Sequence, residues 1–93
     1  MKNGCITEFI DKLYYGEELV FTYKGVKYFL QGWATEETAT MVLDITETSP
    51  FSGYIWKHEA PTIRECAEEF LKVQIWDGKD FLKIENDVEW TDW

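Results

Sequence analysis

The sequence predicts an α+β domain in which a four-stranded, mostly antiparallel sheet has an N-terminal and a C-terminal helix packed on one face. Three observations lead to this prediction. A capped amphipathic helix follows residue 61, a β-hairpin with a recognisable turn begins near residue 19, and two further extended stretches lie between them. Because 93 residues suffice for one domain and leave no room for a second, we expect a single domain over residues 1–93.

The most distinct element runs from Pro61 to Leu71. Thr62 and Glu65 have the Thr-x-x-Glu spacing of a capping box, in which each side chain satisfies a backbone N–H at the helix start. Behind the cap, apolar side chains recur at helical spacing and form one stripe: Ile63, Cys66, Ala67, Phe70 and Leu71. Charged residues fill the opposite side, so we expect the stripe to be buried against a sheet.

Residues 4–15 are expected to form a first helix. Apolar residues recur there at helical spacing, and the set is Cys5 or Ile6, Phe9, Ile10, Leu13 and Tyr14. Gly16 is placed to end this helix in a left-handed conformation. Both cysteines, Cys5 and Cys66, fall on the apolar stripes of expected helices, so we interpret them as buried, reduced thiols.

Residues 19–33 fit a β-hairpin whose register follows from its turn. If Lys24-Gly25 is a two-residue turn, three apolar pairs face each other on one side of the sheet: Tyr23 with Val26, Phe21 with Tyr28, and Leu19 with Leu30. The other side then pairs Thr22 with Lys27 and Val20 with Phe29. One choice of turn therefore sorts the apolar from the mixed positions on both strands.

Two more strands and a C-terminal segment complete the predicted fold. Residues 39–47 alternate as a third strand, and residues 54–58 form a short fourth strand that is rich in aromatic residues. Near the C-terminus we expect a short helical turn over residues 80–86, followed by an extended segment over residues 88–90.

The second side of the predicted sheet is less apolar than the first but is not plainly solvated. It carries Val20, Phe29, Trp33 and Val42, together with either Tyr54 and Trp56 or Ile55. Either the C-terminal segment covers this side, or the side is a contact surface.

The charge balance is strongly acidic, with 18 acidic and nine basic residues and a net charge of −9. Direct binding to nucleic acid or to an anionic membrane is therefore disfavoured, since both would repel this chain. The sequence shows neither the apolar core of a signal peptide nor a stretch long enough to cross a membrane, so we expect a cytoplasmic protein.

Catalytic and metal-binding sites are not indicated. His58 is the only histidine, and the adjacent Glu59 would point to the opposite face of a strand. Cys66 lies mid-stripe, where apolar surroundings suppress thiol reactivity. Two cysteines and one histidine fall short of a zinc ligand set, and the turn at residues 77–80 is too short for a calcium loop. We therefore expect a non-enzymatic protein without a metal or cofactor.

The acidic residues themselves are the leading candidates for function. No basic residue occurs between Lys27 and Lys57, and after Lys83 every charged residue is acidic. Carboxylates steer the encounter with a basic partner, and an aromatic side chain can anchor the contact. We expect a small domain that docks on a basic protein surface as an inhibitor or adaptor, through these residues: Glu36, Glu37, Asp44, Glu47, Asp87, Glu89 and Trp90.

Four other hypotheses stay open. Acids spaced like phosphates would let the domain imitate a nucleic-acid backbone and inhibit a nucleic-acid enzyme, as a phage- or mobile-element-encoded inhibitor does. A sheet face built by Phe29, Trp33 and Trp56 would instead bind a small molecule or a peptide. The second side of the sheet, or an open edge strand, would support a homodimer. The simplest alternative is that Trp90 and Trp93 hold the C-terminus against the body while the acids face water.

The run from Glu69 to Phe81, followed by Val88-Glu89-Trp90, resembles the C-terminal third of short uncharacterised proteins of Gram-positive bacteria and their mobile elements. The resemblance implies a bacterial cytoplasmic or phage-borne setting. It carries no assigned activity and no functional residue.

Overall fold

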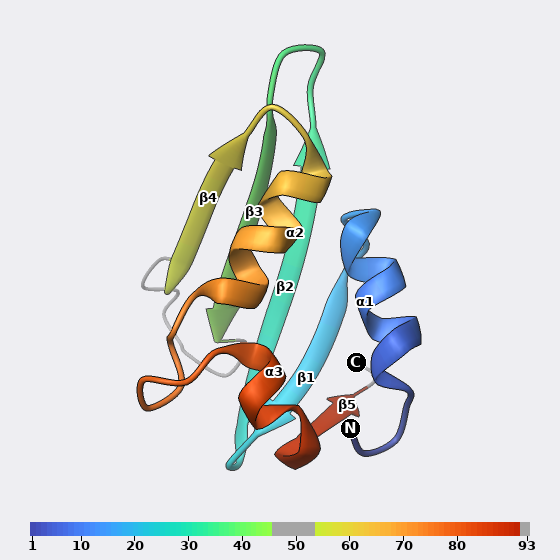
Figure 1. Cartoon of the computed structure of the whole chain (residues 1–93), viewed down its shortest axis with the longest axis vertical. Helices are drawn as coiled ribbons and strands as arrows, with labels where there is room; N and C mark the ends of the chain where they lie inside the picture. Colours follow the sequence, from blue (N-terminus) through green and yellow to red (C-terminus); the bar gives the residue numbers. More distant parts are fainter. Residues whose placement is uncertain (46–53, 92–93) are drawn as a thin grey trace.

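The computed structural model describes residues 1–45 and 54–91, and within these ranges five antiparallel strands form one sheet (Figure 1). The sheet order is β4-β3-β2-β1-β5. The strands are β1 Leu19–Tyr23, β2 Val26–Ala34, β3 Ala39–Ile45, β4 Trp56–Ala60 and β5 Val88–Thr91. The helices are α1 Ile6–Tyr14, α2 Ile63–Lys72 and α3 Phe81–Ile84, and the 3-10 turn η1 Glu85–Asp87 follows α3. The α+β class is therefore confirmed.

The predicted strand number is wrong, because the C-terminal segment joins the sheet as β5. This segment pairs antiparallel with β1, with Val20 opposite Thr91 and Tyr23 opposite Val88. Its pairing satisfies the backbone groups along the outer side of β1, and Val88 is fully buried beneath the helices. An extended conformation over residues 88–90 was expected, but sequence alone does not show which strand a four-residue segment will join.

The β1–β2 hairpin has the predicted register. Leu19 lies opposite Leu30, Phe21 opposite Tyr28 and Tyr23 opposite Val26. Lys24 and Gly25 both have positive φ, +49° and +80°, as a two-residue hairpin turn with the twist of the flanking strands requires.

Helix α2 begins at the predicted cap. The Thr62 hydroxyl accepts a hydrogen bond from the backbone N–H of Glu65 at 3.2 Å, and the same hydroxyl lies 3.4 Å from the Glu65 carboxylate. The apolar stripe behind it packs on β2, β3 and β4, and Cys66, Ala67 and Phe70 are fully buried. Helix α1 is shorter than predicted, since it runs only from Ile6 to Tyr14, and Gly16 just beyond it has the expected left-handed φ of +71°.

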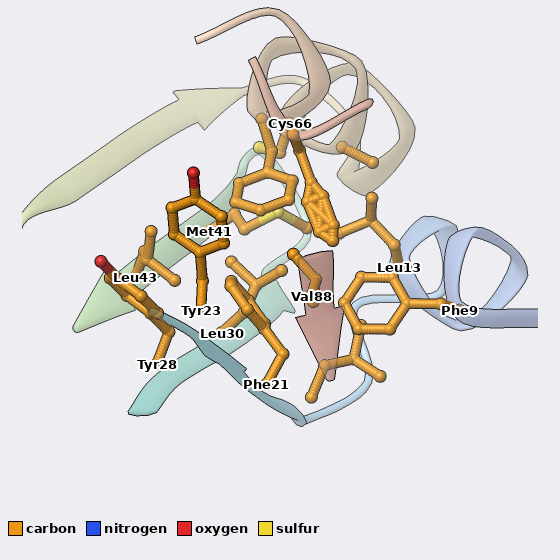
Figure 2. Close-up of a cluster of buried hydrophobic side chains, with 14 of the residues drawn as sticks. Phe9, Leu13, Phe21, Tyr23, Tyr28, Leu30, Met41, Leu43, Cys66 and Val88 are labelled. Carbon is orange, nitrogen blue, oxygen red and sulfur yellow. The ribbon is translucent and has the colours of Figure 1, made fainter. Parts of the chain in front are cut away.

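The helices all lie on one face of the sheet in Figure 1, and the core fills the space between them and the strands. Phe81 of α3 lies at its centre, with ring centroids 5.2 Å from Phe9, 5.2 Å from Phe21 and 5.4 Å from Phe70. Figure 2 shows Phe9, Phe21 and Val88 converging from α1, β1 and β5. Each buried aromatic side chain contributes roughly 1.5–3 kcal/mol from burial alone, so this cluster fixes the helices on the sheet.

Trp76 closes the same core beside Phe81. Its indole makes T-shaped contacts with four neighbouring rings, those of Phe21, Tyr28, Phe70 and Phe81. Its Nε1–H is buried and has no hydrogen-bond acceptor among the residues described. A buried donor without an acceptor costs free energy, and the packing of the indole against these rings offsets that cost.

Two expectations about side-chain placement are wrong. Cys5 lies just before α1 and is exposed, because the helix starts at Ile6, two residues after the predicted start at residue 4; Cys66 is buried as expected. Trp56 lies on the helix face of β4, where its ring is 5.6 Å from that of Phe70, so it does not share a face with Phe29 and Trp33. The predicted aromatic face of three rings is therefore not formed.

Replacing Thr62 with alanine removes the hydroxyl that caps α2. We expect the free energy of unfolding to fall by about 1 kcal/mol, because the N–H of Glu65 loses its acceptor. Thr62→Ser is the matched control, since it keeps the hydroxyl and should retain most of the stability. Urea denaturation measures both, and an equal loss in the two variants would contradict the capping role.

Candidate protein-binding surface

The residues predicted to bind a partner lie in three separate places. Glu36 and Glu37 occupy the tip of the β2–β3 hairpin, at the opposite end of the sheet from β5 (Figure 1). This tip is held by a hydrogen bond from Thr35 N to Thr38 O at 2.7 Å, and both glutamates are exposed. Glu47 lies outside the residues that the structure describes.

Asp44 lies on the face of the sheet away from the helices, opposite Phe29 in the neighbouring strand. Partial burial raises the pKa of its carboxyl above the ordinary value. Strands are spaced about 4.8 Å apart, so roughly 14 Å of sheet separates β3 from β5. Asp44 therefore belongs neither with the hairpin tip nor with the C-terminal acids.

Asp87 and Glu89 lie together at the opposite edge, and both are exposed. Trp90 points the other way, toward the helix side of the sheet. Its ring meets that of Phe9 edge-on at 5.3 Å and is half-buried. The side chain thus packs the C-terminal strand β5 against α1. This placement agrees with the hypothesis that Trp90 holds the C-terminus against the body, and not with a Trp90 ring left exposed to anchor a partner.

The N-terminal residues run beside the outer edge of β5. Lys2 N donates to Val88 O and Trp90 N donates to Lys2 O, each at 2.8 Å, so Lys2 adds one parallel bridge to the sheet. Asn3 then takes a positive φ of +60°, and Gly4 passes directly against the Trp90 ring. This turn carries the chain away from β5 and into α1.

Three hollows lie along β5, and together they make up one surface of the protein. One hollow of about 410 Å³ is lined by Asn3, Gly4, Glu8, Glu89, Trp90 and Thr91. A second, of about 520 Å³, shares Glu89 and adds Asp87; a third, of about 200 Å³, shares Trp90 and Thr91 and adds Glu17 and Glu18. We call this the β5 surface and define its acidic residues as Glu8, Glu17, Glu18, Asp87 and Glu89.

Most of these carboxylates are not neutralised by a neighbouring base. Glu17 lies 3.8 Å from Lys12 Nζ, whereas the other four make no ion pair within residues 1–45 and 54–91. Lys2 and Lys24 also line the second hollow, but Lys24 pairs with Asp77 at 3.2 Å, outside the surface. The β5 surface therefore keeps an excess of free negative charge around its hollows.

Sequence reasoning found Asp87 and Glu89 but missed the other three acids of this surface. Glu8 comes from α1, and Glu17 and Glu18 come from the segment that joins α1 to β1. No local pattern links them to the C-terminus. Their proximity arises because β5 pairs with β1 and because Trp90 packs on α1.

The residues considered for chemistry lie apart from this surface. His58 on β4 stacks on Trp56 with ring centroids 6.1 Å apart. The contact between Cys66 and His58 is made with the backbone, since Cys66 Sγ lies 3.7 Å from the His58 carbonyl oxygen. Burial raises the pKa of the Cys66 thiol. Within the described ranges, no three His, Cys, Asp or Glu side chains group closely enough to hold a metal ion. Among the same residues, no helix has the length and apolar character needed to cross a membrane.

Comparison with protein-family models, with curated proteins and with solved structures gives no match to this chain.

Gly4→Ala should destabilise the protein by about 1–3 kcal/mol, because the added Cβ would overlap Cε3 of Trp90 and force the ring or the chain to shift. Trp90→Leu removes that overlap, so the cost of Gly4→Ala should shrink in the Trp90→Leu background. A double-mutant cycle from urea denaturation measures the coupling. Additive costs would show that Trp90 is not the obstacle.

The two thiols should differ strongly in reactivity. The backbone N–H groups of Glu8 and Thr7 at the start of α1 hold the pKa of Cys5 below its ordinary value, which raises the thiolate fraction near neutral pH. In folded protein, iodoacetamide should alkylate Cys5 alone, and in urea it should alkylate both. Mass spectrometry of Cys5→Ser and Cys66→Ser proteins assigns each site. Rapid alkylation of Cys66 without denaturant would contradict its burial.

Proposed function

We propose that this protein is a small non-enzymatic binding domain, and that the β5 surface docks on a basic segment of a partner protein. The observation that carries the proposal is the convergence of acids from α1, from the α1–β1 connection and from β5 around shared hollows. Such a surface favours lysine and arginine side chains, since the acids steer the encounter and the hollows receive the side chains.

The position of Glu89 supports this choice over the other acidic places. It lines both the first and the second hollow, it is exposed, and it has no ion-pair partner in the part of the chain that is described. Glu36 and Glu37 also line a hollow, of about 320 Å³, but its lining residues all come from the single turn between β2 and β3, whereas the β5 surface gathers acids from three separate segments. Asp44 is partly buried, so its carboxylate is less accessible to a partner than the exposed acids of the β5 surface.

The other functional hypotheses receive less support. Imitation of a nucleic-acid backbone calls for carboxylates in a row at phosphate spacing, whereas Glu36 and Glu37 lie at one end of the sheet and Glu89 at the opposite edge. Binding through an aromatic sheet face calls for Trp56 beside Phe29 and Trp33, and Trp56 faces the helices instead. The function that we propose is therefore binding to a basic protein partner in the bacterial cytoplasm.

An oligolysine peptide is a direct probe of the β5 surface. Titration followed by backbone NMR should shift the amides of Glu8, Glu89 and Thr91, and binding should weaken as salt rises. Glu8→Gln/Glu89→Gln should weaken binding about threefold to tenfold, as expected from ~0.3–0.7 kcal/mol for each exposed charge.

Glu36→Gln/Glu37→Gln is the matched control, because it removes the same amount of charge at the hairpin tip. We expect this variant to bind the peptide as tightly as the unmodified protein. Equal weakening by both pairs would mean that net charge alone governs binding, and it would remove the case for a site at β5.

A further inference from the structure

The opposite edge of the sheet is formed by β4. Strand β4 pairs with β3 on one side, and no other strand within residues 1–45 and 54–91 pairs with its outer side (Figure 1). An edge strand of this kind presents unpaired N–H and C=O groups that can pair with another strand. Lys2 partly covers the outer side of β5, whereas β4 has no such covering segment among the described residues.

The side chains of β4 alternate in a way that makes the strand complementary to itself. Lys57 and Glu59 share the face away from the helices, where Lys57 Nζ lies 3.4 Å from Glu59 Oε1. Both side chains are more than half exposed, at 53% and 60%. His58 lies between them in sequence and points to the helix side, next to Trp56.

We propose that two copies of this protein associate by antiparallel pairing of their β4 strands about a two-fold axis at His58. In this arrangement each Lys57 lies directly opposite Glu59 of the second copy, which gives two equivalent ion pairs across the seam. Residues opposite each other in adjacent strands are close enough for such pairs to stabilise the sheet. The two sheets then become one continuous sheet, and the interface is isologous.

The charges select this register over its neighbours. Sliding one strand by two residues in one direction places Lys57 opposite Lys57 of the second copy, and sliding it by two residues in the other direction places Glu59 opposite Glu59. Like charges directly opposite each other destabilise a strand pair.

Two features keep such a dimer weak. The net charge of −9 on each copy opposes self-association, so the dimer should form more readily at physiological salt than at low salt. Charged side chains on an edge strand also commonly prevent pairing with other chains. If Lys57 and Glu59 form ion pairs across the seam, a variant with both charges reversed should still dimerise. If these charges only prevent strand pairing, that variant should remain a monomer.

Sedimentation velocity at ~0.15 M salt, over protein concentrations from micromolar to millimolar, should show a dimer that grows with concentration. Lys57→Glu and Glu59→Lys should each raise the dimer dissociation constant about tenfold or more, because either change places like charges in both pairs. Lys57→Glu/Glu59→Lys restores opposite charges in both pairs and should restore the dimer.

The two single variants are matched controls for net charge. Lys57→Glu makes the chain more acidic by two charges and Glu59→Lys makes it less acidic by two, yet both should weaken the dimer. A monomer at every concentration would overturn the proposal. It would also be overturned if dimerisation followed net charge, with Lys57→Glu weakening the dimer and Glu59→Lys strengthening it. A double variant that fails to dimerise would overturn it as well.

Hydrogen exchange of the unmodified protein supplies a readout that needs no substitution. Exchange of the β4 amides should slow as the protein concentration rises, while exchange in β5 should not change. Concentration-independent exchange at β4 would count against the strand pairing. Because β4 and β5 are opposite edges of the sheet, neither result bears on the β5 surface.

Discussion

The packing of Phe81 between the helices and the sheet is the interaction on which the rest of the structure depends. Its ring contacts those of Phe9, Phe21 and Phe70, which belong to α1, β1 and α2. A chain of this size buries a limited share of its surface, so one aromatic cluster must hold several elements at once. The sheet can supply only one strongly apolar face, and the helices therefore gather on that face (Figure 1).

This one-sided core also decides where the acidic residues meet. Because α3 is fixed over the sheet by Phe81, the chain that follows it enters the sheet at the free side of β1. Trp90 then packs on Phe9, and the N-terminal residues fold along β5. Acids from both ends of the chain come together at this edge as a consequence of core packing, without contributing to the core themselves.

The two edges of the sheet differ in chemistry. The β5 edge carries an excess of acids around hollows and is partly covered by Lys2, which suits a basic partner. The β4 edge carries one base and one acid at alternate positions and no covering strand in the described ranges, which suits a second copy of the same chain. The two proposed contacts lie on opposite edges of the sheet and therefore do not compete for the same surface.

The sequence by itself determined the local elements. The Lys24-Gly25 turn set the register of the first hairpin, and the Thr62 cap set the start of α2, because both depend on residues close together in the chain. Only the tertiary structure decided that residues 88–91 form a fifth strand and that Glu8 lies beside Glu89. Those outcomes depend on burial of Phe81 and Trp90 by elements that are distant in the chain. Because hydrophobic contacts are not directional, contacts between distant elements produce no residue pattern in the sequence from which they could be predicted.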